Sequence, residues 1–333
     1  MATNGDRPER ERVLAELRQA AKLVVVTHEN PDGDALGSLV AMQEILHKIG
    51  KDCLTFIAAR ELPLPHEYSF LQPHAVVSEA PADVAERTIV FLDCGNIDRN
   101  PAEAFHLRPG LHILNIDHHH DNTLFGTVNL VVPEASCTAE IVWDLMQGLG
   151  VTPSRAVADA LYVGLITDTG RFMYENTGRR AHMMAADLID AGVDVHDVYR
   201  RVYEGVPYGK LALLARGLAN IERYDEGRLT ITQLTAADFS LSDAQESYSE
   251  GVVDHLRALE GTRIAALVRE RIGDGRPPGT RKVSLRAGDD AIDVSAIARA
   301  QGGGGHRQAA GFSTELPHDD LVAFLREQLA AQL

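Results

Sequence analysis

Four short motifs of this 333-residue chain place aspartate or histidine directly after a hydrophobic run. They span Thr27–Ala35, Phe91–Gly95, Asn115–His120 and Leu165–Gly170. Carboxylates and imidazoles without a thiolate are typical ligands of manganese, magnesium, cobalt or iron rather than of structural zinc. A single aspartate at such a place is more often a helix cap or a turn residue. Metal chemistry therefore requires that the four motifs converge in the folded chain.

Predicted β-strands precede three of the four motifs. Short runs rich in branched residues predict buried strands at Leu23–Thr27, Cys53–Ile57, Thr88–Asp93 and Leu111–Ile116. Amphipathic segments between and after them predict helices at Ala35–Ile49, Thr138–Leu149, Ser154–Ile166 and Gly178–Ala191. This alternation is typical of an α/β fold with a mostly parallel sheet and helices on both faces. Ligands of such sheets bind beyond the carboxyl ends of the strands, where the three motifs lie.

Four carboxylates of the motifs would repel one another if they met at that edge: Asp32, Asp34, Asp93 and Asp168. At a separation of about 5 Å and an effective dielectric constant of about 20, each pair costs on the order of 3 kcal/mol. Two divalent cations would neutralise four carboxylates. Pairs of metal ions about 3.5–4 Å apart are typical of enzymes that activate water against phosphate esters. Convergence of the motifs therefore predicts a phosphoesterase with a dinuclear metal site.

The composition narrows the class of partner. The formal net charge is −16 and no long lysine or arginine run occurs, which argues against binding of long duplex nucleic acid and favours a small anionic substrate. The three cysteines are far apart and form no C-x-x-C pair, as expected in a reducing compartment. No run of about 18 apolar residues and no apolar leader occurs. We therefore expect a cytoplasmic protein that does not insert into a membrane.

The alternation of strands and helices changes near residue 192. We therefore predict a catalytic domain over residues 1–191, a linker over 192–210 and a smaller α+β domain over 211–333. In the second domain the pattern predicts strands at Arg228–Leu234, Arg263–Arg271 and Arg281–Ala287. It also predicts helices at Glu250–Leu259, Val294–Ala300 and His318–Gln332, and a glycine- and proline-rich hairpin loop at Gly273–Thr280.

Glycines and arginines could bind phosphate. The run Gly302–Gly305 is either a flexible turn or a backbone nest whose N–H groups surround an anion, and the neighbouring His306 and Arg307 add donors. Arg286 ends a predicted strand, from which its planar guanidinium could bind a terminal phosphate. Arg171, just beyond the fourth motif, is equally consistent with a phosphate ligand and with a surface salt bridge.

The order of these motifs resembles that of the DHH phosphoesterase superfamily. The resemblance rests on the pattern His28-x-x-x-Asp32-x-Asp34, on Asp93, on the triplet Asp117-His118-His119 and on Asp168. The segment Gly302–Arg307 is similar to the glycine-rich signature of the DHH-associated C-terminal domain. Together the motifs extend from about residue 20 to residue 315, and the chain is most similar to bacterial nanoRNases, pAp phosphatases and di-adenylate phosphodiesterases.

The resemblance implies a role for each motif residue. One cation would be bound by His28, Asp32 and Asp93, and a second by Asp34, Asp93, His118 and Asp168, with Asp93 as the bridge. His119 would contact the substrate phosphate or the attacking or leaving oxygen, and Asp117 would orient His118. The active site would lie in the cleft between two domains. The second domain would bind the phosphate and base end of a nucleotide through Arg286, Gly304, Gly305 and His306. The role of His120 stays open.

We therefore expect a hydrolase that cleaves short oligoribonucleotides or dinucleotides such as pApA to mononucleotides. Cyclic di-AMP and 3′-phosphoadenosine 5′-phosphate (pAp) are further candidate substrates. Two divalent cations would activate the water, with Mn²⁺ the first choice and Mg²⁺ or Co²⁺ as alternatives. Competing interpretations are a RecJ-type single-strand exonuclease, a manganese inorganic pyrophosphatase and a nucleotide-binding regulator without catalysis. The preferred substrate and the oligomeric state, with a homodimer as one option, stay open.

Overall fold

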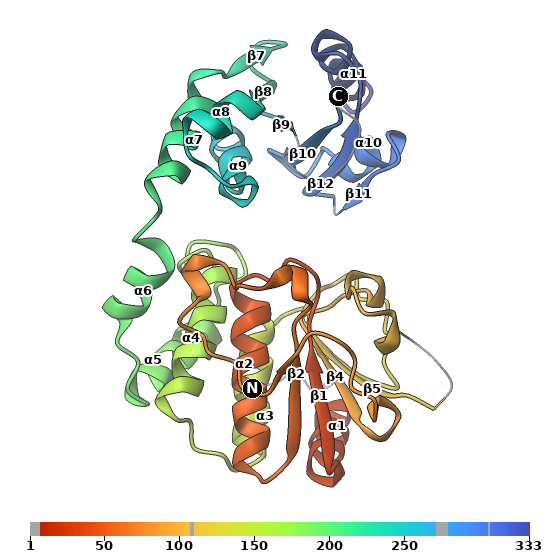
Figure 1. The fold of residues 1–333 in the computed structure, drawn as a ribbon, viewed down its shortest axis with the longest axis vertical. Helices are drawn as coiled ribbons and strands as arrows, with labels where there is room; N and C mark the ends of the chain where they lie inside the picture. Colours follow the sequence, from red (N-terminus) through yellow and green to blue (C-terminus); the bar gives the residue numbers. More distant parts are fainter. Residues whose placement is uncertain (1–6, 107–109, 271–278, 306) are drawn as a thin grey trace. The chain divides into compact units, whose positions relative to one another are not determined.

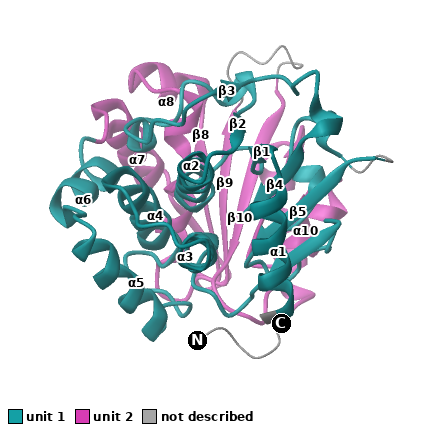
Figure 2. Cartoon of the chain, turned by 90° about the horizontal axis from the view of Figure 1, so that it is seen from below, with its two compact units in different colours: residues 1–205 teal, residues 206–333 magenta. Residues whose placement is uncertain are grey.

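The computed structural model describes residues 7–106, 110–270, 279–305 and 307–333. The chain divides into two compact units, residues 1–205 and 206–333 (Figure 2). The division falls inside the segment 192–210, where the sequence predicts a linker. Helix α6, Val195–Tyr203, nevertheless takes up nine residues of that segment and belongs to the first unit. The assignment of a catalytic domain, a linker and a substrate-binding domain stays a prediction.

The first unit contains a parallel sheet of six strands in the order β3-β2-β1-β4-β5-β6. Figure 1 labels its four central strands, β2, β1, β4 and β5. Its strands are β1 Lys22–Val26, β2 Asp52–Phe56, β3 Val76–Val77, β4 Thr88–Leu92, β5 His112–Asp117 and β6 Val128–Val131. The predicted parallel sheet is confirmed. The sequence pattern missed β3, which has two residues, and β6, which has four, because runs this short carry little periodicity.

The α-helices of the first unit contribute to the larger of its two cores. They are α1 Arg7–Gln19, α2 Gly33–Lys48, α3 Thr138–Gly148, α4 Arg155–Asp168, α5 Arg179–Asp190 and α6. Their apolar side chains form one core on one face of the sheet, where α1, α2 and α3 contact the strands and α4, α5 and α6 pack against other helices. Helices α2 and α4 approach closely because α2 has glycine at the contact: a Cβ on Gly37 would lie 2.3 Å from the Ala160 carbonyl oxygen.

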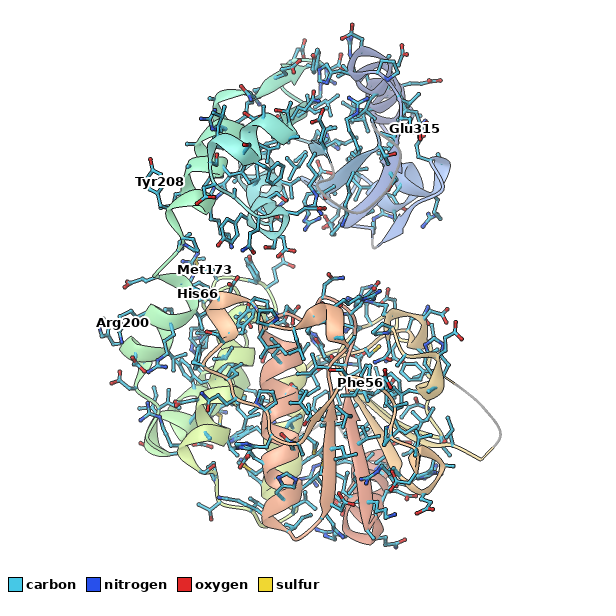
Figure 3. All side chains as sticks on the ribbon, in the orientation of Figure 1. Phe56, His66, Met173, Arg200, Tyr208 and Glu315 are labelled. Carbon is cyan, nitrogen blue, oxygen red and sulfur yellow. The ribbon has the colours of Figure 1, made fainter. Side chains whose placement is uncertain are left out.

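The opposite face of this sheet carries a smaller core, whose described members come from strands, loops and 3-10 helices. Phe56, labelled in Figure 3, meets Phe105 edge to face with ring centroids 4.9 Å apart. Phe105 ends the 3-10 helix Glu103–Phe105, and the 3-10 helices Val84–Glu86 and Ile97–Arg99 pack nearby. The sequence predicts helices on both faces of the sheet. The structure has α-helices on one face and short 3-10 helices on the other.

The second unit contains a mixed sheet of six strands in the order β11-β12-β10-β9-β8-β7. Its strands are β7 Glu222–Tyr224, β8 Leu229–Leu234, β9 Ile264–Glu270, β10 Arg281–Ala287, β11 Gly304–Gly305 and β12 Ala309–Thr314. Neighbouring strands are antiparallel except β8 and β9, which are parallel. Helices α10 Val294–Ala300 and α11 His318–Ala330 pack on one face. Helices α7 Tyr208–Ala219, α8 Ala236–Leu241 and α9 Val252–Arg257 pack on the other.

The predicted smaller α+β unit is confirmed, although the sequence missed several of its elements. Among the missed strands, β12 has the sequence AAGFST, and its small residues have little preference for a strand. Most of the hairpin loop predicted at Gly273–Thr280 lies outside the described residues. Within the described ranges, no helix combines the length and the apolar character that a membrane crossing needs.

Candidate metal centre

Three neighbouring strands bring three of the motifs to one edge of the first sheet. Strands β1, β4 and β5 are adjacent, and the register of their pairing keeps their carboxyl ends level. His28 follows β1, Asp93 follows β4, and Asp117 is the last residue of β5. The carboxyl ends of these strands therefore place the motifs side by side.

Asp93 adopts a left-handed backbone conformation at the end of β4. Its φ is 56°, in a region that costs most non-glycine residues about 1–2 kcal/mol and that aspartate tolerates better than most. The carboxylate is buried, and its Oδ1 accepts a hydrogen bond from Thr138 Oγ1 at 3.0 Å. Oδ2 lies 3.6 Å from His28 Nε2, and Oδ1 lies 3.7 Å from His118 Nε2. His119 Nδ1 also lies 3.7 Å from Oδ1, so three imidazoles surround the Asp93 carboxylate.

The two aspartates of the first motif have different surroundings. Asp32 caps α2, because its Oδ1 accepts from the backbone N–H groups of Asp34 and Ala35. Asp34 is 1% exposed and accepts from the N–H groups of Thr138 and Ala139, at 2.7 and 2.9 Å. Those N–H groups belong to the first turn of α3, so the N-terminus of that helix stabilises negative charge on Asp34.

Helix α4 contributes the fourth motif. Asp168 is its last residue, and the Oδ2 atom lies 3.6 Å from His118 Nε2. Asn176 Nδ2 donates to the same Oδ2 at 3.2 Å. One turn earlier in α4, a Cβ on Gly164 would lie 2.8 Å from Asp34 Oδ1. Glycine at this position therefore leaves room for the buried carboxylate.

The third motif differs from the expectation in one respect. Asp117 Oδ1 lies 2.7 Å from His119 Nδ1, and its Oδ2 accepts from Asn122 Nδ2 at 2.6 Å. His118 Nδ1 instead faces the Ala135 carbonyl at 3.4 Å. The expected pairing of Asp117 with His118 is therefore wrong. In an extended chain, residues two apart point to the same side, which brings Asp117 to His119.

Possible ligand atoms of the motifs meet in three groups, within each of which they lie no more than 4.8 Å apart. The groups are His28, Asp32 and Asp93; Asp34, His118 and Asp168; and Asp93, His118 and His119. The first equals the ligand set expected for one cation. The second, with Asp93 added, equals the set expected for the other. The structure thus brings together all six side chains that the sequence predicts as metal ligands, with His119 as a further neighbour.

Negative charge is concentrated in this cluster. Burial raises the pKa of Asp34 well above its ordinary value, and the carboxylates of Asp93, Asp168 and Asp32 add to the effect. Burial likewise raises the pKa of Asp168 to about 7. Burial also opposes the charged form of Asp93, but its hydrogen bond to His28 helps to outweigh this and lowers its pKa. The side chains of the cluster therefore supply less positive charge than is needed to balance its carboxylates.

The donor set fits divalent cations. All the ligand-type atoms are carboxylate oxygens and imidazole nitrogens. Burial raises the pKa of the Cys94 thiol to about 12 and that of Cys137 well above its ordinary value, so neither offers a thiolate. Oxygen and nitrogen donors around an excess of buried carboxylate suit Mn²⁺, Mg²⁺ or Co²⁺. A candidate metal centre is therefore present in the first unit.

A pocket of about 440 Å³ in the second unit contains three of the predicted phosphate ligands. Arg286, Gly304 and Gly305 line it, together with Arg269 and Lys282. Neither Arg269 nor Lys282 belongs to the motifs singled out from the sequence. Buried and half-buried side chains alternate along β10. Because residues an even number of positions apart point to the same side of a strand, the sequence position of Lys282 predicts that it lies on the same side of the sheet as Arg286.

The Arg286 side chain is held on two sides. Its Nε lies 3.3 Å from Asp254 Oδ1 of α9, and its Nη1 donates to the Leu285 carbonyl at 3.1 Å. These contacts leave Nη2 of the planar guanidinium without a recorded protein acceptor among the described residues. The geometry is therefore compatible with binding of an anion by Arg286.

The other predicted substrate ligands lie apart from this pocket or cannot be placed. Arg307 donates from Nε and Nη2 to the Asp290 carbonyl at 3.2 and 2.8 Å, outside the pocket lining. Arg171 lies with its guanidinium 4.9 Å from the Tyr203 ring centroid, so its recorded partner is aromatic rather than acidic. Met173 in the same loop is 68% exposed (Figure 3). His306 lies outside the described residues, and His120 is exposed.

Comparisons with known proteins match both units. The DHH family, N-terminal domain, matches residues 22–165, and the DHHA1 domain matches residues 235–331. A bifunctional oligoribonuclease and PAP phosphatase of Thermus thermophilus is 32% identical over 96% of this chain and 95% of that protein. A cyclic-di-AMP phosphodiesterase of Geobacillus thermodenitrificans is 27% identical over 87% of this chain and 44% of its own length.

Among solved structures, an exopolyphosphatase-related protein from Bacteroides fragilis has a similar fold. The TM-score is 0.87 at 24% identity, over 98% of this chain and 96% of that one. The parallel sheet, its aspartate and histidine cluster and the sequence matches together define a phosphoesterase, a hydrolase of phosphate esters. The chain belongs to the DHH family, which confirms the resemblance seen in the order of its motifs.

Proposed function

We propose that this protein hydrolyses short oligoribonucleotides and dinucleotides such as pApA to mononucleotides, and pAp to AMP. The observation that carries the proposal is the convergence of six ligand-type side chains, Asp93 among them, in one cluster. The name of the Thermus thermophilus relative, at 32% identity over nearly the whole chain, supports this choice of substrates. Cyclic di-AMP is a further candidate, because the relative named for its hydrolysis is 27% identical.

Two divalent cations are part of the proposal, with Mn²⁺ the first choice. His28, Asp32 and Asp93 would hold one of them. The other would be held by Asp34, Asp93, His118 and Asp168. When bound, such cations neutralise phosphoryl charge and lower the pKa of water. The raised pKa values of Asp34 and Asp168 support the proposal, because divalent cations would relieve the repulsion among these carboxylates.

His119 would donate a proton to the leaving oxygen or a hydrogen bond to the phosphoryl group. Burial opposes protonation of its ring, but the hydrogen bond to Asp117 outweighs this effect and raises the pKa of His119 to about 9. Asp117 also fixes a proton on Nδ1, which leaves Nε2 as the nitrogen that can act on the substrate.

The pocket of the second unit would bind the 5′-terminal phosphate of the same substrate. Arg286 and the backbone N–H groups of Gly304 and Gly305 are the proposed ligands. Arg269 and Lys282 add positive charge to the lining of a chain whose net charge is −16. A local basic pocket on an acidic protein favours a small anion over a long polynucleotide. Phosphate binding by Arg171, His306 and Arg307 stays a prediction.

Initial rates with Mn²⁺ on pApA, pAp, cyclic di-AMP, pyrophosphate and oligoribonucleotides of increasing length test the proposed function. We expect kcat/KM to be highest with the dinucleotide and to fall with each added nucleotide. A RecJ-type exonuclease would retain its rate on long single strands, and a pyrophosphatase would prefer pyrophosphate. Absence of turnover with all of these substrates would contradict the proposal and favour a regulator without catalysis.

A further inference from the structure

Arg99 places a guanidinium beside the aspartate and histidine cluster, and the sequence motifs did not include it. It is the last residue of the 3-10 helix Ile97–Arg99 and is half-buried. Two hydrogen bonds join this turn to the segment after β1. The Glu29 N–H donates to the Arg99 carbonyl at 2.7 Å, and Asn100 Nδ2 donates to the Thr27 carbonyl at 2.6 Å. The backbone that carries Arg99 is therefore fixed relative to the first motif.

The Arg99 side chain lies against the His28 ring without a suitable acceptor there. Arg99 Nη2 is 3.2 Å from His28 Nδ1, and the same Nδ1 lies 2.7 Å from the Glu29 carbonyl oxygen. A histidine that binds a cation through Nε2 carries its proton on Nδ1, which here would donate to that carbonyl. The guanidinium and the ring N–H are then two donors facing each other, and the contact holds no hydrogen bond.

The charge of Arg99 also lacks an acidic partner in the part of the chain that the structure describes. Over the described ranges, no carboxylate is recorded as its partner, whereas Arg60, which contacts the same segment, pairs with Glu29 Oε2 at 2.6 Å. The His28 ring that Arg99 contacts shares Asp93 with His119, because a nitrogen of each ring lies 3.6 or 3.7 Å from an Asp93 carboxylate oxygen. A half-buried guanidinium without a protein acceptor has lost part of its hydration, and an anion would satisfy both its charge and its N–H donors. An anion beside these two histidines would supply the missing acceptor.

We propose that Arg99 binds a non-bridging oxygen of the phosphoryl group that is hydrolysed. The inference rests on the proposed function and adds a catalytic residue to it. Arg99 differs from Arg286, which is proposed to bind the far end of the substrate. Because phosphodiesters and the 3′-phosphate of pAp share the reacting phosphoryl group, Arg99 acts on all substrates. A planar guanidinium suits this role, since it can make two parallel hydrogen bonds as negative charge develops on the oxygens.

Steady-state kinetics of Arg99→Ala with Mn²⁺ test the inference. We expect kcat/KM to fall by about 10²–10³-fold on pApA, on pAp and on the generic substrate bis(p-nitrophenyl) phosphate. Arg99→Lys should retain more of the wild-type kcat/KM than Arg99→Ala, because lysine keeps the positive charge but cannot make the two parallel hydrogen bonds of a guanidinium. Arg60→Ala is the matched control, and its kcat/KM should stay within about twofold of the wild type.

A second measurement separates phosphate binding from support of His28. Calorimetric titration of the Mn²⁺-loaded protein with inorganic phosphate should show Kd about tenfold or more higher in Arg99→Ala, with unchanged Mn²⁺ content. Unchanged phosphate affinity, or a loss of Mn²⁺ that accounts for the lost activity, would overturn the inference. If Arg99→Ala does not fold, the same phosphate titration of Arg99→Lys and Arg99→Gln tests whether Arg99 binds phosphate. If the wild type hydrolyses no nucleotide, the proposed function fails, while the phosphate titration still decides the role of Arg99.

Discussion

Asp93 combines a buried carboxylate, a left-handed backbone with φ of 56°, and three imidazoles within 3.7 Å. Burial of charge and a left-handed conformation each cost free energy, so their coincidence is typical of a functional position. Asp93 also belongs to two of the three groups of possible ligands. Its loss should therefore affect both of the proposed cations.

We expect Asp93→Ala to lower kcat by more than about 10³-fold and to reduce the number of Mn²⁺ ions bound per chain. Circular dichroism should show a nearly unchanged fold, since the removed side chain lies at the end of a strand. Asp93→Asn is the matched control, because asparagine keeps the shape and tolerates the same φ. An equal loss in both variants would assign the effect to the charge. Retained turnover would exclude a bridging role.

The buried acids make the stability of the metal-free protein depend on pH. Burial raises the pKa of Asp168 to about 7 from an ordinary 3.8 and raises that of Asp34 as well. The pKa of His119 is also raised, to about 9, where the hydrogen bond to Asp117 outweighs burial. Between about pH 4 and pH 9 the folded state therefore binds more protons than the unfolded chain. Its free energy of unfolding should fall as the pH rises through this range.

Urea unfolding of the metal-free protein at pH 5, 6, 7 and 8 measures this dependence. We expect the midpoint to move to lower urea at each step, and Asp168→Asn to flatten the curve near pH 7. Saturating Mn²⁺ should reverse the trend, because cation binding requires the deprotonated carboxylates and strengthens with pH. A metal-free protein that becomes more stable from pH 5 to pH 8 would contradict the raised pKa values.

At the scale of elements, Arg87 connects three strands at the end of the sheet opposite to the motifs. Its guanidinium is 7% exposed and donates to the Leu23 carbonyl at 3.1 Å. It also pairs with Asp83 at 2.8 Å and with Asp52 at 3.1 Å. These contacts link the amino ends of β1, β2 and β4. In a parallel sheet, amino ends held level also keep the carboxyl ends level, where the motifs lie.

We expect Arg87→Met to lower the free energy of unfolding by about 2–4 kcal/mol, because it removes the cationic partner of a buried carbonyl and of Asp52, while Asp83 keeps Lys22. Urea denaturation with Mn²⁺ present measures the change. Arg155→Met is the matched control: Arg155 pairs with Asp159 one turn along α4 and is 49% exposed, so its loss should cost less than about 1 kcal/mol. Equal costs for the two variants would show that Arg87 does not hold the strands.

At the scale of the whole molecule, the proposed function assigns the two ends of one substrate to two different units. We expect Arg286→Ala to raise KM for 5′-phosphorylated dinucleotides by about 10–100-fold, the effect of one charged hydrogen-bonded contact. Hydrolysis of bis(p-nitrophenyl) phosphate should be unchanged, because it has no terminal phosphate to bind. Arg326→Ala, which removes the partner of Asp225 in the same unit, should alter neither reaction. Equal losses on both substrates would mean that Arg286 has only a structural role.

Most of the fold was predictable because its elements depend on local patterns. Strand β4 and helix α10 lie at or within one residue of their predicted bounds, since alternation and capping are properties of a few consecutive residues. Strands β3 and β12 were missed because their short or small-residue sequences prefer no structure by themselves. Pairing with β2 and β10 stabilises them.

The sequence by itself determined the kinds of ligand and their places beyond strand ends or at a helix end. Only the tertiary structure decided which of them meet. Asp34 caps α3 across 104 positions, and Arg99 reaches His28 across 71. Asp117 contacts His119 rather than His118. Periodicity fixes where a side chain points relative to its own element. Which residues a side chain contacts depends on strand register and helix packing, because a shift of a few ångströms breaks a hydrogen bond between residues far apart in the sequence.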